Sequence, residues 1–279
     1  RVGRGVLSSA LNTIAQPSDG VVTGVGDDAA VLRQPNGEFQ VISTDHLRSF
    51  INDPGLMTQI AALHALGDIW AMGAQPQIGL ASIVLPQMSA DLQKRTLLEV
   101  TQIASQVLSA AGAQLVGGHT TMGAELTIGF TVTGTKKTMP LTISGAKPGD
   151  MLILTRPIGS GVILAADMLG QAGGRDVAAT LLTMGQAQDR EAALLAPVAH
   201  AMTDVTGFGL AGHVHAMCQA SKLDAYLFHD AIPTYPGARV LSDAGVSSTL
   251  MPANYLDTPV VGPHDALLFD PQTAGGLLA

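Results

Sequence analysis

The sequence is short of aromatic residues, of charge and of cysteine, and each shortage excludes a class of protein. Aromatic residues make up 4% of the 279 residues and charged residues 13%, whereas hydrophobic residues make up 47%. Such a chain can bury a large core of aliphatic side chains, and its composition is not that of a disordered protein. The length allows two packed domains or one large domain.

Cysteine and basic residues limit the possible partners. Cys218 is the single cysteine, so neither an intramolecular disulfide nor a cysteine-rich metal site can form. This composition fits a reducing compartment, and we expect a cytoplasmic protein. The net charge of −8 argues against nucleic acid as a partner, because nucleic-acid-binding proteins usually carry a basic face. Apolar runs such as Ile78–Pro86 are far shorter than the ~20 residues that cross a bilayer, so we expect no membrane partner.

Hydrophobic periodicity and turn residues predict both helices and strands along the chain. The predicted helices cover Val6–Ile14, Pro54–Met72, Ala90–Ala111, Val162–Leu169, Ala187–Ala201 and Leu210–Ala220. The predicted strands cover Ala29–Leu32, Phe39–Thr44, Ile78–Leu85, Gln114–Val116, Leu126–Thr133 and Met151–Thr155, and short strands and loops finish the chain. The pattern predicts an α+β fold in which helices cover mixed sheets.

A polar segment, Gly134–Asp150, separates two halves of the chain. It carries three lysines and ends in the turn-like sequence Lys-Pro-Gly-Asp at 147–150. Segments of this kind often mark a domain boundary. We therefore predict two domains, over residues 1–143 and 144–279.

Six aspartates have unusual neighbours. Most have an ordinary interpretation when taken singly, because aspartates in glycine turns, at strand ends or before proline are common turn and cap formers. Asp68 differs, since it interrupts an apolar helix and a buried charge is costly unless it is paired or bound to a metal. An exposed helix edge is the other interpretation of Asp68. The six are Asp27, Asp28, Asp45, Asp68, Asp204 and Asp270.

The combined pattern indicates more than any single aspartate. No lysine or arginine lies inside the six motifs, so local basic partners are missing. Clustered carboxylates without cations need another source of positive charge, and Mg²⁺ is the natural candidate because it prefers oxygen ligands. A metal held by aspartates and completed by phosphate oxygens is the usual arrangement in phosphoryl transfer. The spacing in sequence leaves the proximity of these side chains open.

Two glycine-rich segments are candidate phosphate sites. Val116–Thr121 follows a predicted apolar strand, and its bare N–H groups could form an anion nest. Thr206–Gly209 leads into a predicted helix, whose N-terminus favours anions. Either segment is also typical of an ordinary turn. No Walker A sequence occurs, so a nucleotide would be held through metals and backbone groups.

Histidines suggest a different chemistry. His200, His213 and His215 surround the Asp204 motif, and a zinc site can be imagined from them. However, no HExxH motif occurs, and His213 and His215 would point in nearly opposite directions from a helix. Serine hydrolysis is disfavoured because GxSxG is missing.

Taken together, the motifs resemble the selenophosphate synthetases (selenide, water dikinases). These belong to a larger family with aminoimidazole ribonucleotide synthetase, thiamine monophosphate kinase and a hydrogenase-maturation protein. The similarity extends along nearly the whole chain. Its most specific parts are His200–Leu210 with Gly212-His213, Asp270–Leu278, Gly117–Thr120 and Asp68–Gly73.

The resemblance implies a two-domain aminoimidazole ribonucleotide synthetase-like fold, a homodimer formed by pairing N-terminal sheets, and ATP and selenide as substrates. The N-terminal domain (1–143) would then bind ATP and metal and form the dimer. By the same resemblance, Asp28, Asp68 and Asp204 are Mg²⁺ ligands. The implied contacts to ATP are Asp27, Asp45, Asp68, Gly117, Gly118 and His119, with Asn254 and Asp270–Gly276 as further contributors.

The chain departs from the family pattern at its ends. Family members carry a cysteine or selenocysteine and then a lysine, and in this numbering both fall before Arg1, so the catalytic residues are unknown. Cys218 is no substitute, and we interpret it as a packing residue. The chain starts without Met and stops inside the apolar run Gly275–Ala279, so we interpret it as a fragment. If the N-terminal cysteine and lysine segment is truly absent, we expect nucleotide binding without efficient selenophosphate formation. The alternatives are a noncatalytic ATP-binding module of a fused protein, or a related small-molecule kinase such as thiamine monophosphate kinase.

Overall fold

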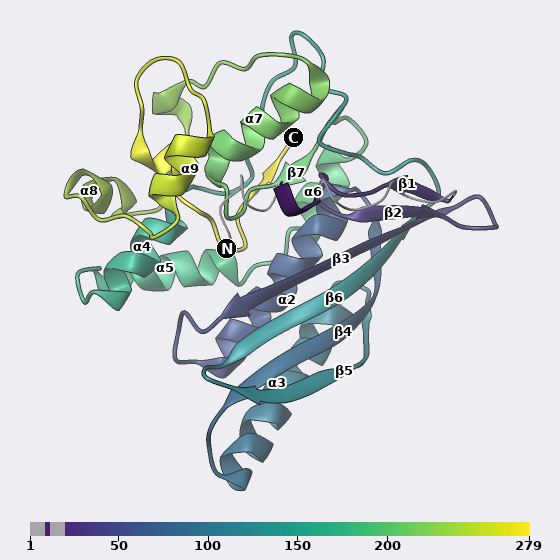
Figure 1. Cartoon of the computed structure of the whole chain (residues 1–279), viewed down its shortest axis with the longest axis vertical. Coiled ribbons are helices and arrows are strands. Elements are labelled where there is room, and N and C mark those ends of the chain that lie inside the picture. The colour runs from purple at the N-terminus through teal and green to yellow at the C-terminus, as the bar shows by residue number, and fades with distance from the viewer. Residues whose placement is uncertain (1–8, 12–19) are drawn as a thin grey trace. The chain divides into compact units, whose positions relative to one another are not determined.

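The computed structural model describes residues 9–11 and 20–279, which fall into two compact units (Figure 1). The sheet unit comprises Asp19–Pro140 and Gly185–Ala196. The helical unit includes Leu141–Met184 and Pro197–Ala279. Each unit buries its own set of aliphatic side chains.

A six-stranded mixed sheet forms the centre of the sheet unit. Its strands β4 and β5 run parallel, and all other neighbours run antiparallel. Strand β5 stands at one edge of the sheet and β1 at the other. In spatial order the strands are β1 (Val21–Thr23), β2 (Ala30–Arg33), β3 (Phe39–Arg48), β6 (Thr127–Lys136), β4 (Gln75–Pro86) and β5 (Gln114–Gly123).

Helix α2 (Pro54–Ala71) packs on β3, β6 and β4 and is buried along almost its whole length. Pro54 occupies the first turn, where its missing N–H costs nothing, and the Asp53 carboxylate caps the helix by accepting from the Leu56 N–H at 2.9 Å. Met57, Ile60 and Ile69 are fully buried. A helix that is apolar on nearly every side needs cover beyond the sheet, and α3 supplies part of it.

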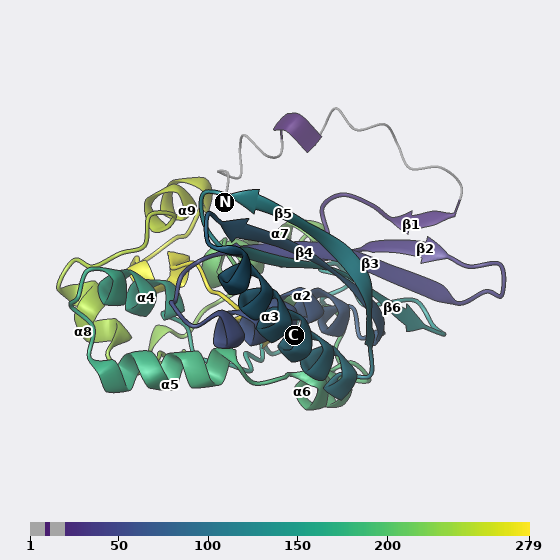
Figure 2. The same cartoon turned by 90° about the horizontal axis from the view of Figure 1, so that it is seen from below.

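Helix α3 (Ala90–Ala110) is amphipathic, and it buries only Val100, Ala104 and Leu108. These positions recur at spacings of four, which places them on one helix face. Figure 2 shows α2 and α3 on the same side of the sheet, whose opposite face carries no helix of the sheet unit. Helix α6 (Asp189–Leu195) also belongs to this unit, and the Gln59 amide of α2 donates to the carbonyl of Gly185 at 2.6 Å.

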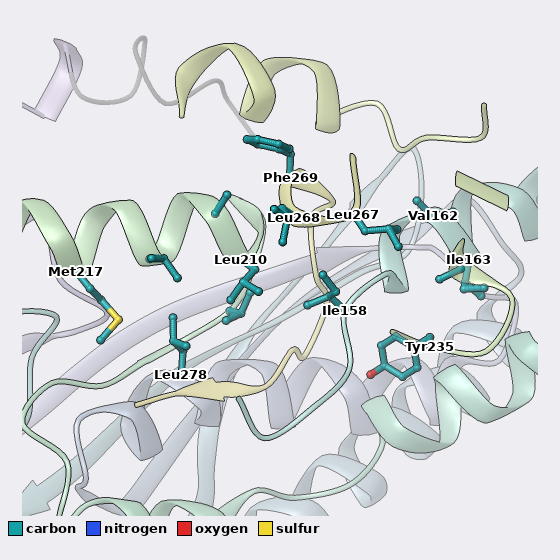
Figure 3. Packing of buried hydrophobic residues seen from close by; sticks show 14 of the residues in the cluster. Ile158, Val162, Ile163, Leu210, Met217, Tyr235, Leu267, Leu268, Phe269 and Leu278 are labelled. Carbon is teal, nitrogen blue, oxygen red and sulfur yellow. The ribbon is translucent and has the colours of Figure 1, made fainter. Parts of the chain in front are cut away.

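The helical unit has short helices around one apolar core. Figure 3 shows part of that core, in which Leu210 and Met217 of α7 pack with Phe269 and Leu278. Its only ladder among the described residues is the two-stranded sheet of β7 and β8. The elements are α4 (Ser160–Met168), α5 (Gly174–Met184), β7 (Thr203–Asp204), α7 (Gly209–Ser221), η1 (His229–Ala231), α8 (Ala238–Asp243), α9 (Met251–Asp257), η2 (Ala266–Phe269) and β8 (Leu277–Leu278).

The predicted α+β class with helices over a mixed sheet is confirmed, and the long helices begin and end within two residues of their predicted bounds. The helix predicted over Val6–Ile14 falls largely outside the described residues. None of the described helices is both long enough and apolar enough to span a membrane.

Several local features differ from the predictions. The strand predicted over Met151–Thr155 is shortened to a bridge between Leu154 and Leu278, with backbone hydrogen bonds from Ile153 to Ala279 and from Thr155 to Leu277 on either side. The helix predicted over Ala187–Ala201 ends at Leu195, because Pro197 cannot continue it. Helix α5 was not predicted, and the end of the chain, predicted as short strands and loops, forms α8, α9 and two short 3₁₀ turns before the short strand β8.

Candidate metal centre

Two of the predicted metal ligands lie together inside the sheet unit. Asp28 lies two residues before β2, and Asp68 lies near the end of α2 and is 7% exposed. Their carboxylates each have an oxygen within 4.8 Å of the other. The structure therefore brings two acidic groups, forty residues apart in sequence, to one place beside the sheet.

Strand β3 supplies a hydroxyl to this pair. The Ser43 hydroxyl donates a short hydrogen bond to the Asp68 carboxylate and lies 3.4 Å from the Asp28 carbonyl oxygen. Ser43 follows the buried Val41 by two residues, so both side chains lie on the face of β3 that is turned toward Asp68 of α2. Ser43 thus connects the helix that carries Asp68 with the turn that carries Asp28.

Asp45 lies one repeat further along the same face of β3. Its carboxylate is 3.9 Å from Nε2 of His64, which is 4% exposed in the interior of α2. His64 precedes Asp68 by four residues, a rise of about 6 Å along the helix. Asp45 follows Ser43 by two residues, about 6.7 Å along the strand. Because these two spacings are nearly equal, the face of α2 that carries His64 and Asp68 meets the face of β3 that carries Asp45 and Ser43 at two successive points.

Asp27 lies beside the pair in sequence but has a local role in the turn. Its carboxylate accepts from the N–H of Asp28 at 3.0 Å. That bond stabilises the turn that leads into β2 and orients the Asp28 backbone. Asp27 is half-buried.

The predicted glycine loop at Gly117, Gly118 and His119 is not a loop. All three residues lie inside β5, paired in parallel with Leu80, Ala81 and Ser82 of β4. The prediction failed because an exposed edge strand with glycines lacks the apolar alternation of a half-buried strand.

Gly118 has a packing reason to lack a side chain. A Cβ atom there would lie 2.0 Å from the Ala81 carbonyl oxygen, closer than any contact allows. The imidazole of His119, in contrast, is exposed at this edge of the sheet.

The donor set of the Asp28–Asp68 pair fits a small divalent cation. Both groups offer oxygen, which Mg²⁺ prefers, and two oxygens on opposite sides of one Mg²⁺ are about 4.2 Å apart at the usual distance of about 2.1 Å. The observed separation, within 4.8 Å, is close to that value. Two carboxylates at such a distance repel each other, and a cation between them removes the repulsion.

Asp204 belongs to the helical unit and is described there. It lies on β7, pairs with Leu277 of β8, and is 3% exposed. The next residue, Val205, donates its N–H to the carbonyl of Gly276 at 2.8 Å. Asp204 therefore sits on a short, fully buried ladder, as expected for a side chain that must be held in a fixed direction.

Asp270, interpreted from the sequence as a turn former or a contributor to ATP binding, is buried with 0% exposure. Its carboxylate accepts from the N–H of Gly161 at 2.9 Å and from the Gln272 amide at 3.1 Å. The Gln272 side chain in turn accepts from the N–H groups of Gly159 and Ser160. The two side chains thus occupy the free N–H groups at the start of α4, as caps do.

Burial raises the pKa of Asp270 to about 7, against the opposing effect of hydrogen bonds from the Val162 N–H, Gln272 and the Gly161 N–H. Asn254 is 7% exposed and donates to the carbonyls of Gly207 at 2.8 Å and Phe269 at 2.9 Å. Both residues therefore have structural partners within the helical unit.

The histidines near Asp204 are engaged in ways that do not support a zinc site. Nδ1 of His200 lies 2.9 Å from the Asp150 carboxylate at the surface. Nε2 of His213 accepts the N–H of Thr206 at 3.0 Å, which uses the lone pair that a metal would need. The two rings are thus committed to different partners.

Three contact residues were missed by the sequence analysis: Ser43, His64 and His213. A signal for the first two existed, because Ser43 shares a strand face with Asp45, and His64 precedes Asp68 by one helical turn. His213 was considered only as a metal ligand.

Comparison with known proteins agrees with the two units. Residues 26–135 match the family model of the AIR synthase related protein, N-terminal domain, and residues 147–247 match that of the AIR synthase related protein, C-terminal domain. The chain is 34% identical over 294 residues to a selenide, water dikinase of Burkholderia pseudomallei (strain K96243), covering 100% of this chain and 82% of that protein.

A second selenide, water dikinase, from Nitratidesulfovibrio vulgaris (strain DP4), is 35% identical over 300 residues, covering 100% of this chain and 83% of that protein. Among solved structures, AaThiL complexed with AMPPCP and TMP superposes with a TM-score of 0.73 at 18% identity, covering 99% of this chain and 84% of that one. At that identity the structural likeness supports the fold alone.

Proposed function

Because the chain belongs to the AIR synthase related proteins and, within them, to the selenide, water dikinases, it is a phosphotransferase, and we propose that it converts ATP, selenide and water into selenophosphate, AMP and phosphate. The observation that carries the proposal is the Asp28–Asp68 pair, whose carboxylate oxygens lie within 4.8 Å of each other. Phosphoryl transfer needs neutralisation of the phosphate charges, and aspartates that hold Mg²⁺ are a common way to provide it.

In this proposal the Mg²⁺ ligands are Asp28, Asp68 and Asp204. Bound there, Mg²⁺ would neutralise the triphosphate and orient it for attack. The protein's own part is to hold the carboxylates in place: Ser43 fixes the Asp68 carboxylate, and the β7–β8 ladder fixes the backbone of Asp204. Ligands held by such outer contacts bind a metal more tightly than ligands that must be ordered on binding.

The proposed contacts to ATP are Asp27, Asp45, Asp68, Gly117, Gly118 and His119. Carboxylates repel phosphates, so Asp27 and Asp45 suit a contact made through a metal, a water or a ribose hydroxyl. The exposed His119 can donate to a phosphate oxygen directly. His64 beside Asp45 limits the directions that the Asp45 carboxylate can take.

We further propose a homodimer that pairs the sheet units of two copies. Among the strands that the structure describes, the edge strand β5 has a neighbour on one side only. Leu80 on β4 and Val116 and Met122 on β5 are all more than 40% exposed. An unpaired edge strand flanked by exposed apolar side chains is a favourable place for strand pairing with a second chain.

The single cysteine, Cys218, favours a reducing location, and we propose the cytoplasm.

Product analysis of the full-length protein tests the proposed reaction. With ATP, Mg²⁺ and selenide, we expect AMP and phosphate by ion-exchange chromatography and selenophosphate by ³¹P NMR, all dependent on selenide. Asp28→Asn and Asp68→Asn should each lower AMP release by about 100-fold or more, since each removes a charge that stabilises the transferring phosphoryl group. The exposed Asp91→Asn is the matched control and should keep full turnover.

Other outcomes would contradict the proposal in distinct ways. ADP as the sole nucleotide product, formed without selenide, would indicate a related small-molecule kinase of the same fold. Tight ATP binding without any turnover would indicate a noncatalytic nucleotide-binding module. Normal AMP release in both Asp variants would remove the metal-site claim while leaving the reaction in place.

A further inference from the structure

The segment that carries Asp204 is held by side-chain contacts from the helix that follows it. Residues Thr203–Gly209 run from β7 to the start of α7, and the dikinase reaction as described assigns a role to Asp204 alone among them. His213 lies on the first turns of α7 and is 9% exposed. Side chains on a helix lean toward its N-terminus, so the ring of His213 lies over the segment that precedes the helix.

The ring contacts the segment on both sides of Asp204. Nε2 accepts from the N–H of Thr206 at 3.0 Å, and Nδ1 lies 3.3 Å from the Thr203 hydroxyl. Because Nε2 accepts from an N–H group, the proton of the neutral imidazole is on Nδ1 and is donated to Thr203. The Thr203 hydroxyl is itself 3.3 Å from the Asp204 carbonyl oxygen, to which it donates. One imidazole therefore spans the peptide units around the aspartate.

The helix that carries the ring is itself fixed. Leu210 belongs to the same buried core of the helical unit as Leu268, and both are labelled in Figure 3. Gly209 adopts φ +73°, and a Cβ atom there would lie 2.8 Å from the backbone of Phe269. This close approach pins the first turn of α7, so His213 projects from a rigid base.

The other side of the segment is held by the Asp270–Gly276 segment. The carbonyl of Thr206 accepts from the N–H of Gln272 at 3.0 Å, and the Asn254 amide holds the Gly207 carbonyl at 2.8 Å. Phe208 also contacts the His213 ring, with centroids 6.0 Å apart. The N–H of Thr206 is the group that donates to Nε2 of His213. Removal of the imidazole would therefore leave this buried N–H, close to Asp204, without its acceptor.

We propose that His213 is a positioning residue that fixes the backbone around Asp204 and so holds the Asp204 carboxylate in the direction that metal binding requires. The inference rests on the proposed role of Asp204 as a Mg²⁺ ligand. It assigns the histidine no contact with metal or nucleotide. Its effect is exerted through Thr203 and Thr206 alone, as for outer contacts of metal ligands in general.

Binding of Mn²⁺, used in place of Mg²⁺, tests the inference without any turnover. The Kd is measured by electron paramagnetic resonance on the full-length protein with the nonhydrolysable ATP analogue AMPPCP. His213→Leu removes the acceptor and should weaken Mn²⁺ binding by about tenfold, the low end of the effects of losing an outer contact. His213→Gln places an amide oxygen near the position of Nε2 and should restore the wild-type Kd within about threefold, whereas the shorter His213→Asn cannot reach Thr206 and should bind as weakly as His213→Leu.

A merely structural role predicts a different pattern. Met217→Ala, one turn further along α7 and in the same core, should lower the melting temperature without changing the Kd. If His213→Leu does not fold, the Gln and Asn variants carry the comparison, and equal Mn²⁺ affinity in the two would overturn the inference. So would wild-type affinity in His213→Leu while Asp204→Asn binds weakly. If Asp204→Asn binds Mn²⁺ as the wild type does, the proposed ligand itself is wrong, and the inference falls with it.

Discussion

The buried carboxyl of Asp270 makes the stability of the helical unit depend on pH in a direction opposite to that of most aspartates. Burial raises its pKa to about 7, whereas a free aspartate has a value of 3.8. Between these values the folded protein keeps a proton on Asp270 that the unfolded chain has released. The stabilisation is therefore fully present below about pH 3.8 and is lost as pH rises through about 7.

The magnitude follows from the size of the shift. Each pKa unit corresponds to 1.36 kcal/mol, so a shift of about three units is worth about 4 kcal/mol. Asp270→Asn removes the ionisation and keeps an oxygen for the N–H of Gly161. Relative to the wild type, this variant should therefore gain stability as pH rises, by about 3 kcal/mol between pH 4.5 and 8.

Urea unfolding at a series of pH values measures this difference. Groups that titrate alike in the two proteins cancel when the free energies of unfolding are subtracted. A difference that is flat across the range, or that falls as pH rises, would refute the reasoning, because it would mean that Asp270 loses its proton in the folded protein at the same pH as in the unfolded chain, or at a lower pH.

Three further predictions concern other parts of the chain. Burial acts to raise the pKa of Asp265, but hydrogen bonds from Arg239 and the Leu267 N–H outweigh it and lower that pKa. Asp265→Asn should therefore lower the free energy of unfolding by about 1–3 kcal/mol near neutral pH, as measured by urea unfolding. This loss should vanish as pH falls below the ordinary carboxyl range. Gly118→Ala should destabilise by about 1–3 kcal/mol, because its Cβ meets the Ala81 carbonyl. Gly174→Ala has open space at a helix start and should be neutral or stabilising by up to about 1 kcal/mol. Calorimetry measures both changes in stability, and equal effects of the two variants would contradict this prediction. Ser43→Ala should weaken Mn²⁺ binding by about tenfold through the loss of its bond to Asp68, and an unchanged Kd would show that this hydroxyl does not orient the carboxylate.

The long helices and the fold class could be predicted from the sequence because local signals and burial agree there. Pro54 and Asp53 mark the start of α2, and Ser89 caps α3 by accepting from the Leu92 N–H. In β5 the local signals and the observed structure disagree. Glycines and exposed polar residues at a sheet edge are typical of a loop in sequence, and only the pairing with β4 shows that they form a strand. The apolar run at Met151–Thr155 was predicted as a full strand, but only its last three residues pair with the chain end, because the partner strand β8 is two residues long.

The candidate site could be predicted only in part, for a similar reason. Residue type and motif selected Asp28 and Asp68, which the fold brings together. Sequence gives no measure of long-range hydrogen bonding, so Asp270 was interpreted as a turn or a site residue although its carboxylate holds the start of α4. His213 was considered as a metal ligand for the same reason, since its bond to the Thr206 N–H depends on how α7 packs.

The central claim is that Asp28 and Asp68 share a divalent cation that binds the triphosphate of ATP. Crystals of the full-length protein grown with Mn²⁺ and AMPPCP test it directly through anomalous scattering at the manganese edge. The account predicts a peak bonded to carboxylate oxygens of both aspartates and to phosphate oxygens of the nucleotide, at about 2.1–2.2 Å, and its loss in Asp68→Asn. Ordered nucleotide in the crystal with no manganese at these two carboxylates would contradict it.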